Sequence, residues 1–516
     1  MKKNILMLAA EHGGFAGAKV GGVGDVIRDL PQALNQQNCN SYVALPSYGF
    51  LARLPQLKKI GEVEVSFYDY AHRVTVYSTD QAGHKVYIFD HPFFSHKGET
   101  VYCDDPDHAP FSSDASKFAL FCASVAQALL DHVLPMPHVV HCHDWHTGFF
   151  PLLAQKHSAF KPLRHLPIVF TIHNLAMQGV RPITGDKSSL NAWFGESVTD
   201  YHDCIDPVYQ GCINPMRAGI VLSQKVHTVS PTYALEILKP SNQPQGVFGG
   251  EGLEEDLIKK HNTGKLFGIL NGCDYSIKTG RKSSKDSLCD LMHGALSKWI
   301  AKATVLQSVH YLASQNVHRW QSHKAAGLTV TSVGRLTEQK VRLLLTSTTA
   351  GRCVIDDLLY SLKGKGTFIL LGSGNAHLEK EFCVRMGEHP HFIFLNGYDE
   401  ALSNKMYAYG HLFLMPSSFE PCGISQLLAM RAGQPCLVSG VGGLKDTVAH
   451  DENGFVFTGE NDTQKSKQLI ALFNSVVDMF FSQKDAYKKI QKNAKATRFS
   501  WGSSAKEYVK KLYDFS

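Results

Sequence analysis

Two cations, Arg335 and Lys340, stand five residues apart just beyond an apolar run that ends at Val333. An apolar run followed by a helix-like segment predicts a strand-to-helix turn, where both side chains could converge on one anion. Paired cations in such a turn can stabilise the charge that develops on a departing diphosphate. A solvated charged surface is the alternative, but the positive end of a helix disfavours cations at its start. The spacing therefore favours a phosphate-binding role.

Glu420 lies in a second turn of this kind, Ser417–Ile424, which follows the apolar run Leu412–Pro416. The next residue is a proline, which holds the carboxylate near the end of the run. The backbone amides of Cys422 and Gly423 open the next helix and could meet an anion. A carboxylate beside an anion site suits the hydroxyl groups of a sugar.

The first part of the chain contains a glycine-rich segment, Gly13–Gly24, with six glycines in twelve residues around Lys19. Glycines let a backbone approach a ligand closely, and the amides that open the following helix, near Gly21 and Gly22, would favour an anion. The spacing is neither Gly-x-Gly-x-x-Gly nor a Walker lysine loop, which disfavours dinucleotide and P-loop sites. A mobile surface loop is the alternative interpretation.

Imidazole and carboxylate side chains follow two further apolar runs. His141–His146 contains three histidines and Asp144, and His173 and Asn174 come directly after Pro167–Ile172. A metal site is one interpretation, but side chains of a strand and its exit turn point in different directions, and no second ligand cluster is evident. We expect instead a polar rim without a metal, where Asp144 hydrogen-bonds sugar hydroxyls or cations.

These turns can act together only if parallel strands bring their carboxyl ends to one edge of a sheet. Short apolar runs alternate with helix-length segments, as in a parallel sheet covered on both faces. The pattern predicts an α/β protein with two Rossmann-like, doubly wound parallel sheets that face each other across a cleft. The predicted strands are Asn4–Ala10, Val139–Cys142, Pro167–Ile172, Leu328–Val333, Thr367–Leu371, Phe392–Leu395, Leu412–Pro416 and Pro435–Ser439, and the predicted helices include Leu288–Ala313, Ala401–Tyr409 and Ile424–Ala432.

The same pattern predicts the domain organisation. The first lobe spans residues 1–276 and the second lobe residues 328–490, with a polar, basic connection that contains a helix over residues 277–327. Residues 491–516 form a C-terminal helical segment.

Composition excludes several classes of protein. A chain of 516 residues, 44% hydrophobic and 19% charged, is neither disordered nor a mini-scaffold. A net charge of +6 without a block of like charges does not favour nucleic-acid binding. The 12 scattered cysteines are typical of free thiols in a reducing compartment, and no apolar stretch suits a membrane span or secretory signal. We therefore expect a cytoplasmic protein that binds neither nucleic acid nor membrane.

Taken together, the motifs resemble the bacterial glycogen synthase and plant starch synthase family over nearly the whole chain. Each motif is weak alone, but seven occur in order: Lys19-Val-Gly-Gly-Val-Gly-Asp25, His143-Asp-Trp-His146, Thr171-Ile-His-Asn-Leu175, Val229-Ser-Pro-Thr-Tyr233, Gly268-Ile-Leu-Asn-Gly272, Arg335-Leu-Thr-Glu-Gln-Lys340 and Glu420-Pro-Cys-Gly423. The resemblance implies the GT-B fold, with the final helix returning to the first lobe. It also implies retaining transfer of glucose from ADP-glucose to the 4-hydroxyl at the non-reducing end of an α-1,4-glucan, without a cofactor.

The resemblance implies a role for each candidate residue. Arg335 and Lys340 would neutralise the diphosphate as it leaves, Glu420 would bind glucose hydroxyls, and His173 would contact the transferred sugar. Lys19 and its glycine loop would close on the donor phosphates. The other residues with an implied substrate-binding role are Gly21, Gly22, Asp144, Asn174, Asn271, Cys422, Gly423 and Ile424.

Several positions depart from the family pattern. Gly14 replaces a proline, two residues are added before Lys19, the stretch Ser276–Gly280 lacks a Trp-x-Pro sequence, and Val341 replaces a glycine. Two alternatives stay open: a retaining GT-B transferase that uses UDP-glucose or another acceptor, and a noncatalytic glucan-binding homologue. Retention of the full set of candidate catalytic residues argues against the second. The sequence gives no basis for an oligomeric state.

Overall fold

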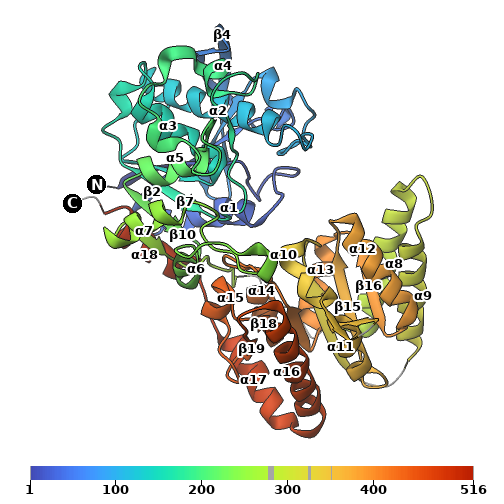
Figure 1. Ribbon diagram of the computed structural model, residues 1–516. Coiled ribbons are helices and arrows are strands. Elements are labelled where there is room, and N and C mark those ends of the chain that lie inside the picture. The colour runs from blue at the N-terminus through green and yellow to red at the C-terminus, as the bar shows by residue number, and fades with distance from the viewer. Residues whose placement is uncertain (1, 277–283, 324–326, 350, 515–516) are drawn as a thin grey trace. The chain divides into compact units, whose positions relative to one another are not determined.

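The computed structural model describes residues 2–276, 284–323, 327–349 and 351–514. The chain divides into two compact units (Figure 1). Unit 1 comprises the chain up to Ser241, Gly249–Gly272 and the residues from Ser500 onward, and unit 2 comprises Asn242–Phe248 and Cys273–Phe499. Most of the altered stretch Ser276–Gly280 lies outside the described residues.

Unit 1 is built on a nine-stranded sheet in the order β11-β10-β7-β6-β1-β2-β5-β4-β3. Neighbouring strands from β11 to β5 are parallel, whereas β4 pairs with β5 and β3 in antiparallel register. The strands are β1 (Lys3–Leu8), β2 (Cys39–Pro46), β3 (Lys58–Phe67), β4 (Tyr70–Gln81), β5 (His84–Asp90), β6 (Val139–His143), β7 (Ile168–Ile172), β10 (Lys225–Thr228) and β11 (Leu266–Gly268). The helices are α1 (Gly22–Asn35), α2 (Ser112–Leu130), α3 (Phe149–Lys156), α4 (Leu190–Phe194), α5 (Pro215–Leu222), α6 (Pro231–Glu236), α7 (Glu254–Asn262) and α18 (Trp501–Glu507).

The chain changes direction within this sheet at β1. From β1 the chain adds β2 and then β3, β4 and β5 on one side, and it returns to place β6 on the other side of β1, with Leu8 paired to Cys142. Loops that leave two such neighbouring strands diverge, and the crevice outside their carboxyl ends is where ligands bind in open α/β sheets. The segments after β1 and β6 carry the predicted residues Lys19 and Asp144.

Unit 2 contains a six-stranded sheet in the order β16-β15-β12-β17-β18-β19, and all its pairs are parallel. The strands are β12 (Leu328–Val333), β15 (Gly366–Gly372), β16 (Phe392–Asn396), β17 (Leu412–Met415), β18 (Cys436–Ser439) and β19 (Gly454–Phe457). This is the Rossmann order, with its switch point between β12 and β17. The predicted Arg335–Lys340 turn follows β12, and the predicted Glu420 turn follows β17. The sheets in both units confirm the α/β, Rossmann-like prediction.

The helices of unit 2 include two that the sequence analysis merged into one. In place of a single helix over Leu288–Ala313, the structure has α8 (Lys285–Lys302) and α9 (Ser308–Ser322). Each buries its own apolar face in the core of unit 2, and the turn between them exposes 74% of Val305. One straight helix could not direct both faces to that core. The other α-helices among the described residues of unit 2 are α10 (Glu338–Val341), α11 (Val354–Leu362), α12 (Ala376–Glu388), α13 (Glu400–Tyr409), α14 (Ser425–Ala432), α15 (Gly442–Thr447), α16 (Asp462–Ser482) and α17 (Lys484–Ala496).

The last residues of the chain belong to unit 1, where the red C-terminal segment with α18 lies among blue and green elements (Figure 1). The Nζ of Lys3 donates to the carbonyl of Tyr513 at 2.7 Å, and the hydroxyl of Ser504 donates to the carbonyl of Leu270 at 2.7 Å. Tyr508 and Tyr513 are buried. In the part of the chain that the structure describes, no helix is both long and apolar enough to cross a membrane.

Candidate active site

In unit 2 the turns after β12 and β17 bring a lysine and a carboxylate into contact. The Nζ of Lys340 donates a hydrogen bond to Oε2 of Glu420, which also accepts one from the hydroxyl of Ser417 at 3.2 Å. The Glu420 side chain is only 7% exposed and that of Lys340 is 26% exposed. This ion pair joins positions 80 residues apart in sequence, so the turns predicted separately form one site.

The backbone around Glu420 is held by tight packing. The amide of Ser418 donates to the carbonyl of Gln339 at 2.8 Å, which ties the Glu420 turn to the residue before Lys340. Gly442 has a φ of 42°, and a Cβ there would lie 2.0 Å from the carbonyl oxygen of Glu420. The loop that begins α15 thus requires glycine at position 442, because its backbone packs directly against the Glu420 backbone.

Arg335 differs from Lys340 in its surroundings. It is exposed, and within the described ranges no acidic side chain forms an ion pair with its guanidinium. Its turn is fixed at the next residue, because the Leu336 amide donates to the carbonyl of Ser373 at 3.0 Å and the Leu336 carbonyl accepts from the Asn375 amide at 2.8 Å. Arg335 is therefore an uncompensated cation on a well-anchored turn, suited to an anionic ligand.

Cys422, Gly423 and Ile424 form the link between Glu420 and α14. Gly423 has a φ of 76°, and Ile424 is the residue that precedes the first turn of α14. The fully buried side chain of Gln426 holds this link, because its Nε2 donates to the carbonyls of Cys422 at 3.0 Å and Gly423 at 3.1 Å. Gln426 and Ser417 could not be identified from the sequence, because their roles depend on contacts rather than on a motif.

In unit 1 the glycine loop is organised by Glu11, which the sequence analysis did not single out. Its Oε2 accepts hydrogen bonds from the amides of Val20 at 2.7 Å and Gly21 at 2.6 Å, and its Oε1 accepts one from the hydroxyl of Tyr102 at 2.8 Å. Two of the amides predicted to bind an anion near Gly21 are thus occupied by a carboxylate of the chain itself. Glu11 lies just beyond the carboxyl end of β1, and this place after a buried strand was the sequence signal that could have identified it.

Lys19 lies on the outer side of this loop. Its Nζ donates to Oδ1 of Asp25 in the first turn of α1 at 2.7 Å, and the side chain of Lys19 is 41% exposed. Oδ1 of Asp25 also lies 3.2 Å from Nη1 of Arg28. Gly22 is the first residue of α1 and Gly21 precedes it. The structure therefore places Lys19 against its own helix, from which an exposed lysine can turn toward a ligand.

Replacing Glu11 by alanine is expected to loosen the glycine loop, because two backbone amides lose their acceptor. These amides are only partly buried, and a hydrogen bond to a charged group contributes about 1.5–3 kcal/mol, so the free energy of unfolding of unit 1 should fall by about 2 kcal/mol. Limited trypsin digestion should cut faster after Lys19. The matched variant Glu11→Gln retains an acceptor oxygen and should be affected less. Equal cleavage rates in Glu11→Ala and the unaltered protein would contradict this account.

Asp144 and His173 meet at the carboxyl ends of β6 and β7. Oδ1 of Asp144 accepts hydrogen bonds from the backbone amides of His173 at 2.7 Å and Asn174 at 3.3 Å. Asp144 has a φ of 57° and a ψ of 178°, an extended positive-φ conformation that is rare outside glycine and is often retained at functional sites. The predicted residues Asp144, His173 and Asn174 thus form one cluster.

Burial sets the protonation of this cluster. It raises the pKa of Asp144 to about 7 from 3.8, although the amides of His173 and Asn174 favour the charged form. Burial also lowers the pKa of His173 to about 3. Near neutral pH the imidazole of His173 is therefore uncharged, and it can donate and accept hydrogen bonds but provides no positive charge. The carboxyl group of Asp144, in contrast, can hold or release a proton.

Asn271 occupies another strand end of unit 1, just after β11. It is 4% exposed, and its Oδ1 has no hydrogen-bond partner among the described residues. A buried amide oxygen usually has a partner. This oxygen is therefore suited to accept a hydrogen bond from a ligand.

The histidines at the end of β6 and in the turn after it do not gather around one point. Nδ1 of His143 is 2.9 Å from Nε2 of His173, whereas the ring of His146 stacks on Tyr102 with centroids 5.1 Å apart. Among the described residues, three possible ligand atoms come within 4.8 Å of one another only at Asp356, Glu388 and His389, in unit 2. None of these three belongs to the predicted site.

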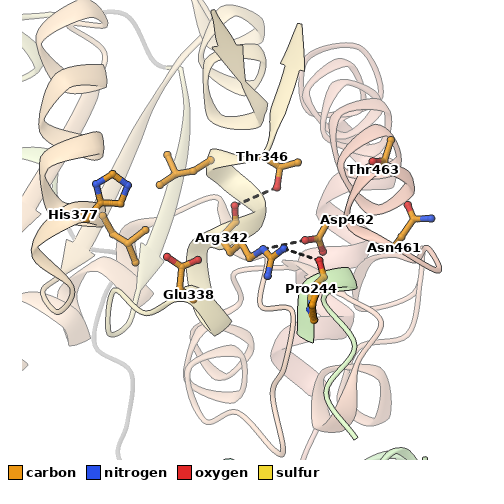
Figure 2. Close-up of a pocket in the computed structure, with 10 residues that line it drawn as sticks. Pro244, Glu338, Arg342, Thr346, His377, Asn461, Asp462 and Thr463 are labelled. Atoms are coloured by element: carbon orange, nitrogen blue, oxygen red, sulfur yellow. Dashed lines mark hydrogen bonds and ion pairs between the residues drawn. The ribbon is translucent and has the colours of Figure 1, made fainter. Parts of the chain in front are cut away.

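Two cavities are lined by residues that are close in sequence to the predicted site residues. One, of about 670 Å³ in unit 2, has Arg342 directed at Asp462 and Pro244, with Glu338 and His377 on another wall (Figure 2). Glu338 and Arg342 each stand two residues from Lys340, and such residues do not share a helix face. The other cavity, of about 520 Å³ in unit 1, is lined by residues that include Phe111, Ala176, Gln178, Arg181 and Tyr209. It begins two residues after Asn174, and neither lining includes a predicted site residue.

Comparison with known proteins covers both units. Residues 4–259 match the starch synthase catalytic domain family, and residues 315–497 match the glycosyl transferases group 1 family. The chain is 31% identical over 504 residues to a glycogen synthase of Desulfitobacterium hafniense, with 95% of each chain covered. It is 32% identical over 531 residues to a glycogen synthase of Aeromonas salmonicida, with 99% of this chain and 98% of that one covered. Its structure is similar to the catalytic domain of starch synthase IV from Arabidopsis thaliana bound to ADP and acarbose, with a TM-score of 0.74, 27% identity and 99% of both chains covered.

Proposed function

Because this chain belongs to the glycogen synthase and starch synthase family, we propose that it transfers glucose from ADP-glucose to the non-reducing end of an α-1,4-glucan with retention of configuration. It is a GT-B glycosyltransferase. Its substrates are a nucleotide-sugar donor and a glucan acceptor. The choice of ADP-glucose as donor is supported by the solved starch synthase domain, which was bound to ADP and acarbose.

The contact of Lys340 with Glu420 at the switch point of unit 2 carries the proposal for the donor. A diphosphate can lie against the exposed guanidinium of Arg335 and the ammonium of Lys340, which also holds the Glu420 carboxylate. Cleavage of the bond between glucose and phosphate places negative charge on the leaving oxygen, and fixed cations stabilise it. Glu420, with one oxygen held by Lys340 and Ser417, can accept hydrogen bonds from glucose hydroxyls.

We assign the Asp144 cluster of unit 1 to the sugar and the acceptor. A neutral His173 can form a hydrogen bond with the transferred glucose without taking a proton from it. Asp144 can accept hydrogen bonds from hydroxyl groups. The cavity beyond Asn174 has the aromatic rings of Phe111 and Tyr209 in its lining, and apolar faces of sugar rings pack on such surfaces. We propose that this cavity binds the glucose units of the acceptor glucan that come next to the reacting unit.

Arg335 and Lys340 supply the charge that a metal would otherwise provide, so we propose that the reaction needs neither metal nor cofactor. We also propose a cytoplasmic location, which is supported by twelve free cysteines.

The deciding experiment offers labelled ADP-glucose or UDP-glucose with glycogen as primer, with and without EDTA. We expect label in the polymer from ADP-glucose, equal rates with the chelator, and α-linked product by proton NMR. Faster transfer from UDP-glucose would identify the alternative donor. Glycogen binding without transfer from either donor would favour the noncatalytic homologue, and chelator inhibition reversed by one divalent ion would contradict the metal-free proposal.

A further inference from the structure

We infer that His143 is a positioning residue that fixes the orientation and the protonated nitrogen of His173, and that Tyr513 of the C-terminal segment supports it through His141. The kinetic test of this inference rests on the proposed function, whereas its spectroscopic test does not. All the groups involved lie in unit 1, around the ends of β6, β7 and β10.

A carbonyl group sets the direction of a chain of hydrogen bonds that leads from His227 to Tyr513. Nε2 of His227 lies 3.3 Å from the carbonyl oxygen of Ile269, which can only accept, so Nε2 carries the proton and Nδ1 of His227 is an acceptor. That Nδ1 lies 2.9 Å from the hydroxyl of Thr171, which therefore donates to it. The Thr171 oxygen in turn accepts from Nε2 of His141 at 2.6 Å. Nδ1 of His141 must then accept from the hydroxyl of Tyr513, 2.7 Å away.

His141 is therefore held at both ring nitrogens and forms a fixed platform. The ring of His143 stacks on it, with centroids 4.2 Å apart and planes 29° apart. Both rings are almost fully buried, at 0% and 1% exposure. Because packed interiors leave little room for other rotamers, the orientation of His143 depends on the His141 platform.

The surroundings of the two ring nitrogens of His143 determine which of them carries the proton. Its Nδ1 lies 2.9 Å from Nε2 of His173, whereas its own Nε2 is buried with no hydrogen-bond partner among the described residues. Buried N–H groups without a partner are rarer than unpaired acceptors and cost about 1–3 kcal/mol. The favoured arrangement has the proton on Nδ1 of His143, donated to Nε2 of His173.

This arrangement determines what His173 can offer to a sugar. With Nε2 accepting from His143, the proton of a neutral His173 must be on Nδ1, which makes that nitrogen a hydrogen-bond donor. His173 retains 9% exposure, so part of its ring reaches the surface of the site. His143 thus presents His173 as a donor to an oxygen atom of the glucose.

The kinetic test compares His143→Leu, which removes the bond, with His143→Asn, whose amide can donate from a similar place. Removing the hydrogen-bond partner that orients a metal-bound histidine typically costs 10- to 100-fold in activity, and we take the same scale for this metal-free pair. We expect kcat of His143→Leu to fall by roughly that factor with the KM for glycogen little changed, and His143→Asn to recover most of it. His157→Leu is the matched control, because it removes a buried histidine of the same unit outside this network. A folded His143→Leu enzyme with unaltered kcat, or no recovery in His143→Asn, would overturn the inference.

The spectroscopic test measures the proton directly and needs no activity. In protein labelled with ¹⁵N-histidine, two-bond proton–nitrogen correlations distinguish the two neutral forms of the ring, and His173→Gln identifies the His173 signals. We expect the proton on Nδ1 of His173, and a gain of the Nε2 form in Tyr513→Phe or His143→Leu. A proton on Nε2 in the unaltered protein overturns the inference even if the enzyme is active. Absence of transfer with the proton on Nδ1 would contradict the proposed function alone.

Discussion

Replacement of Arg335 or Lys340 by alanine is expected to reduce kcat by roughly two to three orders of magnitude, the scale of losing one fixed charge at a developing anion. Both cations face the same leaving group in the proposed reaction. The charge on that group grows only as the bond to glucose breaks, so the loss should appear mainly in kcat. Steady-state kinetics with ADP-glucose and glycogen would measure it.

The two variants should differ in stability, which separates catalysis from folding. Arg335 is exposed and no described acidic side chain pairs with it, so Arg335→Ala should unfold as the unaltered protein does. Removing Lys340 leaves the buried Glu420 carboxylate without its cationic partner. Because the pair is partly exposed, we expect the free energy of unfolding to fall by about 2 kcal/mol. Adding Glu420→Gln to Lys340→Ala should restore stability but not activity.

A nearby arginine provides the matched control. Arg342 lies two residues beyond Lys340, but its guanidinium is paired with Asp462 at 3.1 Å. Arg342→Gln should therefore keep kcat within about threefold, since it removes a cation from the same segment without touching the Glu420 pair. Near-normal rates in both Arg335→Ala and Lys340→Ala would contradict the phosphate role.

Acidification is expected to unfold unit 1 between about pH 6.5 and pH 5. Burial is the main cause of a lowered pKa at seven histidines of unit 1. The pKa falls to about 3 or 4 at His12, His84, His173 and His227. The pKa is also lowered at His141, His143 and His146. Below pH 6.5 the unfolded chain binds protons at these positions and the folded chain does not. The free energy of unfolding therefore falls as pH falls.

The size of the effect follows from proton linkage. Each such histidine costs about 1.4 kcal/mol per pH unit below its unfolded pKa. Asp144, with its pKa raised to about 7, has the opposite sign, because the folded state binds its proton first on acidification. The net loss is on the order of 8 kcal/mol per pH unit, against a typical domain stability of 5–15 kcal/mol.

Unit 2 serves as the internal comparison. The described histidines there with a lowered pKa are His293, His310 and His391, fewer than in unit 1. Hydrogen exchange with peptide mapping across pH 7 to pH 5 should show protection lost first in unit 1, with net proton uptake on unfolding by calorimetry. Constant protection of unit 1 over this range would contradict the assignment of buried neutral histidines.

Much of the fold could be predicted because parallel strands carry a local signal. Apolar runs such as Leu328–Val333, bounded by turn residues, mark buried strands, and functional side chains follow them at the sheet edge. The hairpin of β3 and β4 was not predicted, since its strands alternate exposed and buried residues at one edge rather than running continuously apolar. The division of Leu288–Ala313 was missed because both halves carry similar helical patterns.

The candidate site was less predictable than the fold, because contacts between distant turns are set by packing. The motifs selected Lys340 and Glu420 separately, but only the strand order places them together. Glu11 belongs to no motif on which the sequence analysis relied, and its role appears only when the amides of Val20 and Gly21 are seen to point at it. Which ring nitrogen of His173 carries the proton depends on the hydrogen bond from His143, and the orientation of His143 depends in turn on the packing of β6 and β7 and on Tyr513.

That tyrosine has a consequence for biosynthesis. Residues from Ser500 onward complete unit 1, although the ribosome makes them after all of unit 2. Until they emerge, the nascent first unit lacks the aromatic side chains that cover His141 and His227, and it must wait in a partly open state that chaperones or proteases can engage. A message truncated after codon 499 would still encode every candidate catalytic residue, yet its product would lack the means to finish the unit synthesised first.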